Sequence, residues 1–295
     1  RVLFRSPDSV YGPTARFCEQ RLPRFGITSS RYDPRAGASI ADFITPETQA
    51  IFLEAPGSLT FEIADVPAIV KVARERDILT LADNTWGAGY FFKPLALGVD
   101  LSIQALTKYA VGHADAFGGA VISASDAMKH RVAAVAEQFG FSLSVDDAYT
   151  ALRGMRTMHT RLRAHEASAL ELAEWLSTRE EVAEVLHPAL PSSRDHALWK
   201  RDFTGSCGLF GFVLKPVPDE AMKRFIAALH LFGMGFSWGG YESLLIPCDR
   251  QMDRRAGSWA DDRPGPLLRI HAGLEAVSDL KAELDAAFAA MRSGA

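Results

Sequence analysis

Two side chains in the first half of the sequence could together hold an electron-withdrawing cofactor. Lys108 follows an apolar run, in the phrase Gln-Ala-Leu-Thr-Lys-Tyr, and Asp83 directly follows another apolar run. A lysine amine that is enclosed by protein binds its proton less tightly and becomes a nucleophile, because burial disfavours the charged form. A carboxylate can keep a cationic ring nitrogen protonated. A lysine for a Schiff base and an acid for a pyridinium nitrogen are the minimal side chains that pyridoxal 5′-phosphate (PLP) needs.

Both residues also have ordinary structural explanations. Asp83 and Asn84 could satisfy the amides of a turn, and an acid at this place could also bind a metal ion. Lys108 could extend its ammonium group to water at the end of a strand. Thr107, directly before Lys108, could donate its hydroxyl to a phosphate. The spacing alone therefore favours a PLP site without excluding the alternatives.

The elements predicted around these residues alternate between strands and helices. Asp65 could cap a helix over residues 66–73, where apolar side chains recur at i, i+3, i+4 and i+7. Short apolar runs that predict strands lie at residues 50–55, 78–82, 100–105 and 119–123. This order is typical of a mostly parallel sheet with helices on both faces. Asp83 then lies at the carboxyl end of a strand, where such sheets bind ligands.

The pattern changes from about Thr157 onwards. A long helix with one apolar face is predicted there, and further strands and helices follow at residues 209–214, 219–229 and 267–271 and after residue 278. We therefore predict an α/β fold with two domains. Residues 7–155 would form a large domain with a mostly parallel sheet, and residues 156–295 a smaller α+β domain.

The first six residues, Arg1–Ser6, match what one reading frame of a common sequencing adapter would encode, and the chain lacks an initiating methionine. We expect these residues to be an artefact, with gene sequence beginning near Pro7, part-way into the gene. The large domain would then be truncated at its N-terminus.

The composition excludes several classes of function. The formal net charge is −4 and basic residues are scattered, so no nucleic-acid partner is expected. The three cysteines, Cys18, Cys207 and Cys248, are too far apart for a disulfide framework or a metal pair, which favours a cytoplasmic location. No apolar run reaches the roughly 18 residues of a membrane span. His113 and Asp115 lack further ligands nearby, so we expect no metal site.

The stretch from Asp83 to Asp115 strongly resembles the Cys/Met-metabolism family of PLP-dependent enzymes, which have fold type I. The acid, the Thr-Lys-Tyr phrase and a Gly-His-x-Asp phrase occur together and in the family's order, and the resemblance runs from Asp8 to the end of the chain. It implies that Lys108 holds PLP, that Asp83 pairs with the ring nitrogen and that Thr107 helps to bind the phosphate.

Four further residues match functional positions of that family. Tyr11 resembles the tyrosine that stacks on the cofactor ring and assists at the substrate amine. Arg269 resembles the arginine that binds the substrate α-carboxylate, a task that suits a planar guanidinium. Ser237 and Trp238 lie in a phrase that matches a loop at the border of the active site.

The resemblance implies cleavage of a sulfur amino acid, a small-molecule substrate. Tryptophan after the serine, as at Trp238, is typical of bacterial cystathionine β-lyases, whereas many γ-acting relatives carry leucine there. The expected reaction is therefore β-elimination of cystathionine to homocysteine, pyruvate and ammonia, with the freed Lys108 amine as general base. A γ-acting relative (cystathionine γ-lyase, γ-synthase or methionine γ-lyase) would use the same cofactor residues.

A second alternative to the lyase is that this chain is an inactive fragment that does not assemble. The family implies a homo-oligomer, either a dimer or a tetramer, in the full-length form. In relatives, a segment before the part matched here supplies a glycine-containing phosphate loop and a Tyr-x-Arg pair that reaches into the neighbouring subunit's site. A chain without that segment could have lost PLP binding and assembly.

Overall fold

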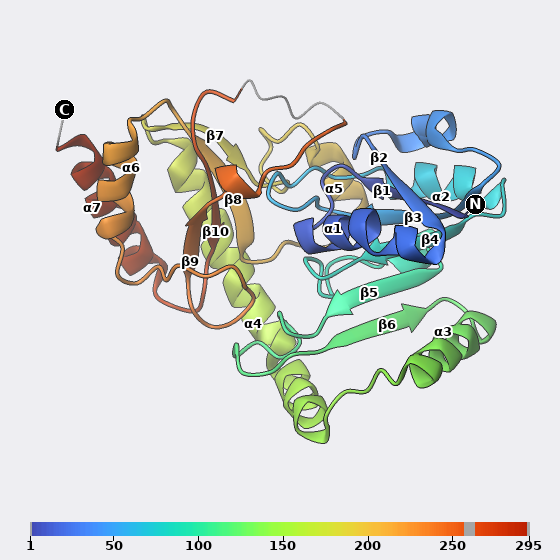
Figure 1. The fold of residues 1–295 in the computed structure, drawn as a ribbon. Coiled ribbons are helices and arrows are strands. Elements are labelled where there is room, and N and C mark those ends of the chain that lie inside the picture. Colours follow the sequence, from blue (N-terminus) through green and yellow to red (C-terminus); the bar gives the residue numbers. More distant parts are fainter. Residues whose placement is uncertain (1, 257–262, 294–295) are drawn as a thin grey trace.

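A long helix, α4 (Val145–Ser177), connects two β-sheets in this computed structural model, which describes residues 2–256 and 263–293 (Figure 1). The first sheet lies N-terminal to α4 and the second lies C-terminal to it. None of the helices in the described residues combines the length and apolar character that a membrane span requires.

Within the described residues, the first sheet has six strands in the order β2-β1-β3-β4-β5-β6. All neighbours pair in parallel except β5 and β6, which are antiparallel. The strands are β1 (Val2–Pro7), β2 (Ile27–Tyr32), β3 (Thr48–Glu54), β4 (Leu79–Asp83), β5 (Leu101–Ala105) and β6 (Gly119–Ser123). The predicted α/β class with a mostly parallel sheet is confirmed.

Helix α2 packs on this sheet as its sequence pattern predicts. Asp65 caps α2 by accepting a hydrogen bond from the Ala68 amide at 3.3 Å. The buried side chains of α2 recur with helical spacing and join the core that contains β3. The helical segments before α4 are α1 (Gly12–Gln20), η1 (Leu22–Phe25), η2 (Gly37–Phe43), α2 (Val66–Arg74), η3 (Pro94–Leu97) and α3 (Asp126–Phe139).

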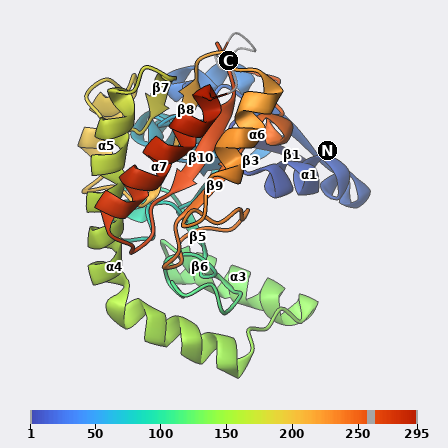
Figure 2. The same cartoon turned by 90° about the vertical axis from the view of Figure 1, so that its left-hand side faces the viewer.

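The second sheet is antiparallel and has the order β7-β8-β10-β9 in the described residues. Figure 2 shows α4, α6 and α7 on one side of it. The elements of this part are β7 (Val182–Leu186), α5 (His196–Asp202), β8 (Leu209–Leu214), α6 (Asp219–Ala227), β9 (Leu244–Pro247), η4 (Asp249–Gln251), β10 (Leu267–His271) and α7 (Val277–Arg292).

Strand β8 is buried on both faces because the second sheet packs against helices on one side and against the first part of the chain on the other. Leu209 and Val213 belong to the core shared with β3 and α2, whereas Phe210 and Phe212 pack with α6 and α7. Successive side chains of a strand point to opposite faces, so the same alternation governs β10. The face of β10 that carries Arg269 is therefore turned towards the first part of the chain.

Two sequence predictions concern the limits of the domains. Residues 2–6, which we attribute to an adapter, lie in β1 between β2 and β3, and their origin stays a prediction. Helix α4 runs without interruption through residues 155 and 156. The division into domains at this point also stays a prediction.

Candidate functional site

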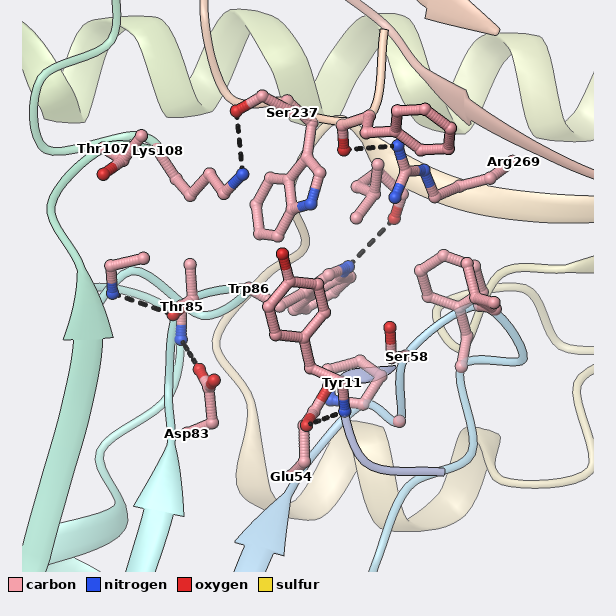
Figure 3. A pocket seen from close by; sticks show the side chains of 18 of the residues that line it. Tyr11, Glu54, Ser58, Asp83, Thr85, Trp86, Thr107, Lys108, Ser237 and Arg269 are labelled. Atoms are coloured by element: carbon pink, nitrogen blue, oxygen red, sulfur yellow. Dashed lines mark hydrogen bonds between the residues drawn. The ribbon is translucent and has the colours of Figure 1, made fainter. Parts of the chain in front are cut away.

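A cavity of about 450 Å³ opens at the carboxyl ends of β3, β4 and β5 (Figure 3). Its size lies in the usual range of about 300–1,000 Å³ for small-molecule sites. Parallel strands end at one edge of a sheet, and here β10 and the loop before β9 close the space from the second sheet. The structure brings all the sequence-predicted site residues to its wall, namely Tyr11, Asp83, Thr107, Lys108, Ser237, Trp238 and Arg269.

The Lys108 amine points into this cavity from the turn after β5 (Figure 3). Its Nζ donates a hydrogen bond to Ser237 Oγ at 2.8 Å and lies 5.0 Å from the centre of the Trp238 ring. Burial, followed by the charge of Arg269, lowers the pKa of Lys108 to about 8, although Asp83 acts in the opposite direction. With that pKa, roughly a tenth of the amine is unprotonated at pH 7, so it can act as a nucleophile or a base.

Two carboxyl groups lie side by side at the strand ends below Lys108. Asp83 of β4 is the register partner of Glu54 of β3, and Asp83 accepts a hydrogen bond from the Thr85 amide at 2.9 Å. Burial raises the pKa of Asp83. Burial and then the charge of Asp83 raise the pKa of Glu54 well above its usual value. Glu54 is therefore held towards its neutral form, and Asp83 is the acid that can carry a charge beside a cation.

Glu54 also fixes the backbone at Tyr11, because its Oε2 accepts a hydrogen bond from the Tyr11 amide at 2.8 Å. Tyr11 directly precedes α1, and Pro13 near the start of that helix suits the change in backbone direction. The tyrosine ring then stands in the middle of the cavity, 48% exposed (Figure 3). The sequence analysis missed Glu54, although an acid at the end of the predicted strand 50–55 is the signal that singled out Asp83.

Arg269 of β10 approaches the cavity from the side opposite Asp83 (Figure 3). It is 8% exposed, and its Nη2 donates to the Phe236 carbonyl at 2.9 Å. Burial lowers its pKa, but a guanidinium remains charged in proteins. No carboxylate of the described residues lies within 4.0 Å of this guanidinium. A buried cation without an acidic partner is suited to receive a carboxylate from a ligand.

The loop that carries Ser237 and Trp238 lies directly against the Lys108 backbone. Trp238 packs on Tyr109 with ring centres 5.6 Å apart. Gly239 has φ +86°, and a Cβ added there would lie 3.1 Å from Lys108 Cα. Only a glycine fits this close approach without strain. The loop therefore sets the environment of the lysine amine.

Thr107 makes its described hydrogen bonds to one residue, Gly118. The Thr107 hydroxyl accepts from the Gly118 amide at 3.1 Å and donates to the Gly118 carbonyl at 3.3 Å. A ligand anion near Thr107 would compete with the carbonyl for the hydroxyl proton. Among the described residues, no group of three His, Cys, Asp or Glu side chains could hold a metal ion.

A family model, curated relatives and a solved structure all match this chain over most of its length. A family model described as "Cys/Met metabolism PLP-dependent enzyme" matches residues 4–289. Cystathionine β-lyase MetC of Escherichia coli is 45% identical over 286 residues, which cover 96% of this chain and 72% of that protein. Mouse cystathionine γ-lyase is 34% identical over 290 residues, with 96% and 72% coverage. The structure of cystathionine γ-lyase from Lactobacillus plantarum complexed with L-serine superposes with a TM-score of 0.91 at 30% identity, covering 99% of this chain and 77% of that one.

Proposed function

Because this chain belongs to the Cys/Met-metabolism family of PLP-dependent enzymes, we propose that its cavity cleaves cystathionine by β-elimination to homocysteine, pyruvate and ammonia. The protein is a PLP-dependent carbon–sulfur lyase of the cystathionine β-lyase type. The observation that carries the site assignment is the Lys108 amine, with its lowered pKa, in the same cavity as Arg269, which lacks an acidic partner among the described residues.

The chemistry of the side chains in the cavity fits PLP. The Lys108 amine suits the aldehyde, the Asp83 carboxylate suits the ring nitrogen, and the Tyr11 ring can stack on a flat heterocycle. Thr107 is the side chain that we assign to the phosphate. When bound, PLP draws electrons from the α-carbon of an amino acid.

The remaining chemistry falls to side chains of this protein. Arg269 binds the substrate α-carboxylate through its planar guanidinium and so orients the α-carbon. The Lys108 amine, held by Ser237, takes the α-proton as general base. The Trp238 ring lies 5.0 Å from the same amine and forms one wall beside it. Loss of the α-proton then allows the bond to the β-sulfur to break, and a thiolate leaves.

The γ-acting alternative would use the same cofactor residues. This chain is more similar to the E. coli β-lyase than to the mouse γ-lyase, and Trp238 also favours the β-lyase type. The product distinguishes the two reactions, because β-elimination leaves a three-carbon keto acid whereas γ-elimination leaves a four-carbon one.

We expect the protein with PLP and cystathionine to form pyruvate without 2-oxobutyrate, as measured by mass spectrometry of the keto acids. Homocysteine should appear in equal amount in a thiol assay. A reaction without protein serves as the control. Predominant 2-oxobutyrate would contradict β-elimination while leaving the cofactor residues as assigned.

We further propose that the protein forms a homo-oligomer through an apolar surface on α3, β6 and the start of α4. Helix α3 buries none of its residues, although a helix of this length gains most of its stability from packing. The exposed apolar side chains on β6, on α3, between α3 and α4 and at the start of α4 are Val121, Ile122, Val135, Phe139, Phe141, Leu143, Val145, Tyr149, Leu152 and Met155.

The location of the protein in the cell is a separate matter, and the cytoplasmic location stays a prediction.

Charge placed on this apolar surface should separate the subunits. We expect the double variant Phe139→Asp, Phe141→Asp to have a smaller mass than the wild type in size-exclusion chromatography with light scattering. The two rings stack 5.8 Å apart on the surface, so their loss removes adjacent contact area. Phe25→Asp is the matched control, because Phe25 is 71% exposed and lies in η1. A monomeric wild type, or an oligomer unaffected by the double variant, would refute the proposal.

A further inference from the structure

His271 lies two residues after Arg269 on β10, so both side chains are on the same face of the strand. Leu268 precedes Arg269, and Ile270 lies between Arg269 and His271. Both point into the core formed with α6 and α7. His271 is 1% exposed and lies beneath the loop that carries Ser237.

Both ring nitrogens of His271 bond to the backbone of that loop. Nε2 lies 3.2 Å from the Gly239 amide nitrogen, which donates the hydrogen bond. Nε2 must therefore be unprotonated, so Nδ1 carries the proton and donates it to the Glu242 carbonyl at 3.0 Å. Burial, followed by the neighbouring His165, Arg269 and Lys108, lowers the pKa of His271 to about 3, so the neutral ring persists at physiological pH.

Strand β10 thus fastens the loop at several points. Arg269 bonds to the Phe236 carbonyl, whereas His271 bonds at Gly239 and Glu242. Ser237 and Trp238 lie between these attachments. Since Gly239 also packs on the Lys108 backbone, a shift of the loop would move the hydroxyl that holds the Lys108 amine.

We propose that His271 is a positioning residue, which holds the loop 237–242 against Lys108 and thereby places Ser237 and Trp238 for the elimination. The inference rests on the proposed function of the same cavity. His271 does not touch the reacting atoms and acts through the loop.

A separate set of hydrogen bonds keeps the end of the loop in place without His271. The Ser243 hydroxyl accepts from the Gly273 amide at 2.8 Å and donates to Glu275 at 2.7 Å. Glu275 also accepts from the Ser243 amide at 2.8 Å. Loss of His271 should therefore loosen residues 239–242 locally, while the pairing of β9 with β10 remains.

His165 of α4 supplies a matched control. Its ring lies 5.1 Å from that of His271, it is fully buried, and burial lowers its pKa as well. Its Nδ1 lies 2.8 Å from the Ala272 carbonyl, and the structure gives it no hydrogen bond to the loop. Leucine at either position replaces a buried ring by an apolar side chain, but only His271→Leu removes bonds to the loop.

Two measurements test the proposal. In the protein without PLP, hydrogen exchange at the Gly239 amide should be at least about tenfold faster in His271→Leu than in His165→Leu, because the bond that protects this amide is absent. With PLP, His271→Leu should lower kcat/KM for cystathionine about tenfold or more, whereas His165→Leu should remain within about twofold of the wild type. Equal exchange in the two variants would overturn the inference, whatever the activity.

Conservative variants keep the test decisive if leucine prevents folding. In His271→Gln the side-chain amide oxygen can accept a hydrogen bond from the Gly239 amide, as Nε2 does. The asparagine side chain of His271→Asn is too short to reach Gly239 and can only donate to the Glu242 carbonyl. We expect slow exchange at Gly239 and most of kcat/KM to return in His271→Gln but not in His271→Asn. Exchange at Gly239 that is the same in both variants would also contradict a role of His271 in holding the loop. Because exchange is measured without substrate, it separates this inference from the proposed reaction.

Discussion

The variant Lys108→Ala should lose both the visible absorbance band that the wild type gains with PLP and the release of pyruvate from cystathionine. The wild-type amine has a pKa of about 8 and faces the cavity, so we assign to it both the covalent hold on PLP and the removal of the α-proton. General base catalysis alone contributes about 100- to 10,000-fold, so the rate should fall by at least about 1,000-fold. Absorbance titration with PLP and a keto acid assay measure the two effects.

Lys93→Ala is the matched control for this variant. Lys93 is exposed and does not line the cavity, so its replacement should leave the spectrum and the rate within about twofold of the wild type. The thermal unfolding temperature of Lys108→Ala should remain close to that of the wild type, because a partly exposed amine contributes little packing. Normal turnover by Lys108→Ala would remove the basis of the site assignment.

The second large effect is expected for Arg269→Ala, which should raise KM for cystathionine by about 100-fold with a smaller change in kcat. The guanidinium is buried and has no carboxylate partner among the described residues, so a substrate carboxylate would supply the missing charge. Hydrogen bonds to charged groups contribute about 1.5–3 kcal/mol each. A contact that is made in both the ground state and the transition state appears in KM rather than in kcat.

A modified substrate makes this prediction specific. An α-carboxamide of the substrate should be a poor substrate for the wild type, but Arg269→Ala should discriminate little between the acid and the amide. Arg269→Lys should recover only part of the affinity, since an ammonium lacks the planar fork of a guanidinium. An unchanged KM in Arg269→Ala would show that another group binds the carboxylate.

Local sequence patterns predict much of the fold. The helical spacing of apolar residues in α2 and the cap at Asp65 need no information from distant parts of the chain, and both are confirmed. The strands at 209–214 and 267–271 are apolar runs that agree with β8 and β10. In contrast, the sequence analysis predicted no helix at α3, which buries none of its residues within this chain.

The positions of residues in the sequence predict only part of the candidate site. Asp83 and Lys108 follow strands of one parallel sheet, so the edge that they share is predictable, although their roles stay predictions. Arg269 lies 161 positions after Lys108 in the sequence, and only the family resemblance connected them before the fold was known. His271 escaped notice because its partners are backbone groups of the loop 239–242, which come near only on folding. Glu54, in contrast, could have been found as an acid at the end of a predicted strand.

The most direct measurement of the central claim is to trap PLP on the protein with sodium borohydride. The reagent reduces the bond between an aldehyde carbon and a lysine nitrogen to one that survives digestion, so mass spectrometry can locate the modified lysine. We predict a phosphopyridoxyl group on the peptide that contains Lys108, and none on that peptide when PLP is omitted. A phosphopyridoxyl group on a different lysine, with Lys108 unmodified, would contradict the account of this cavity as the PLP site.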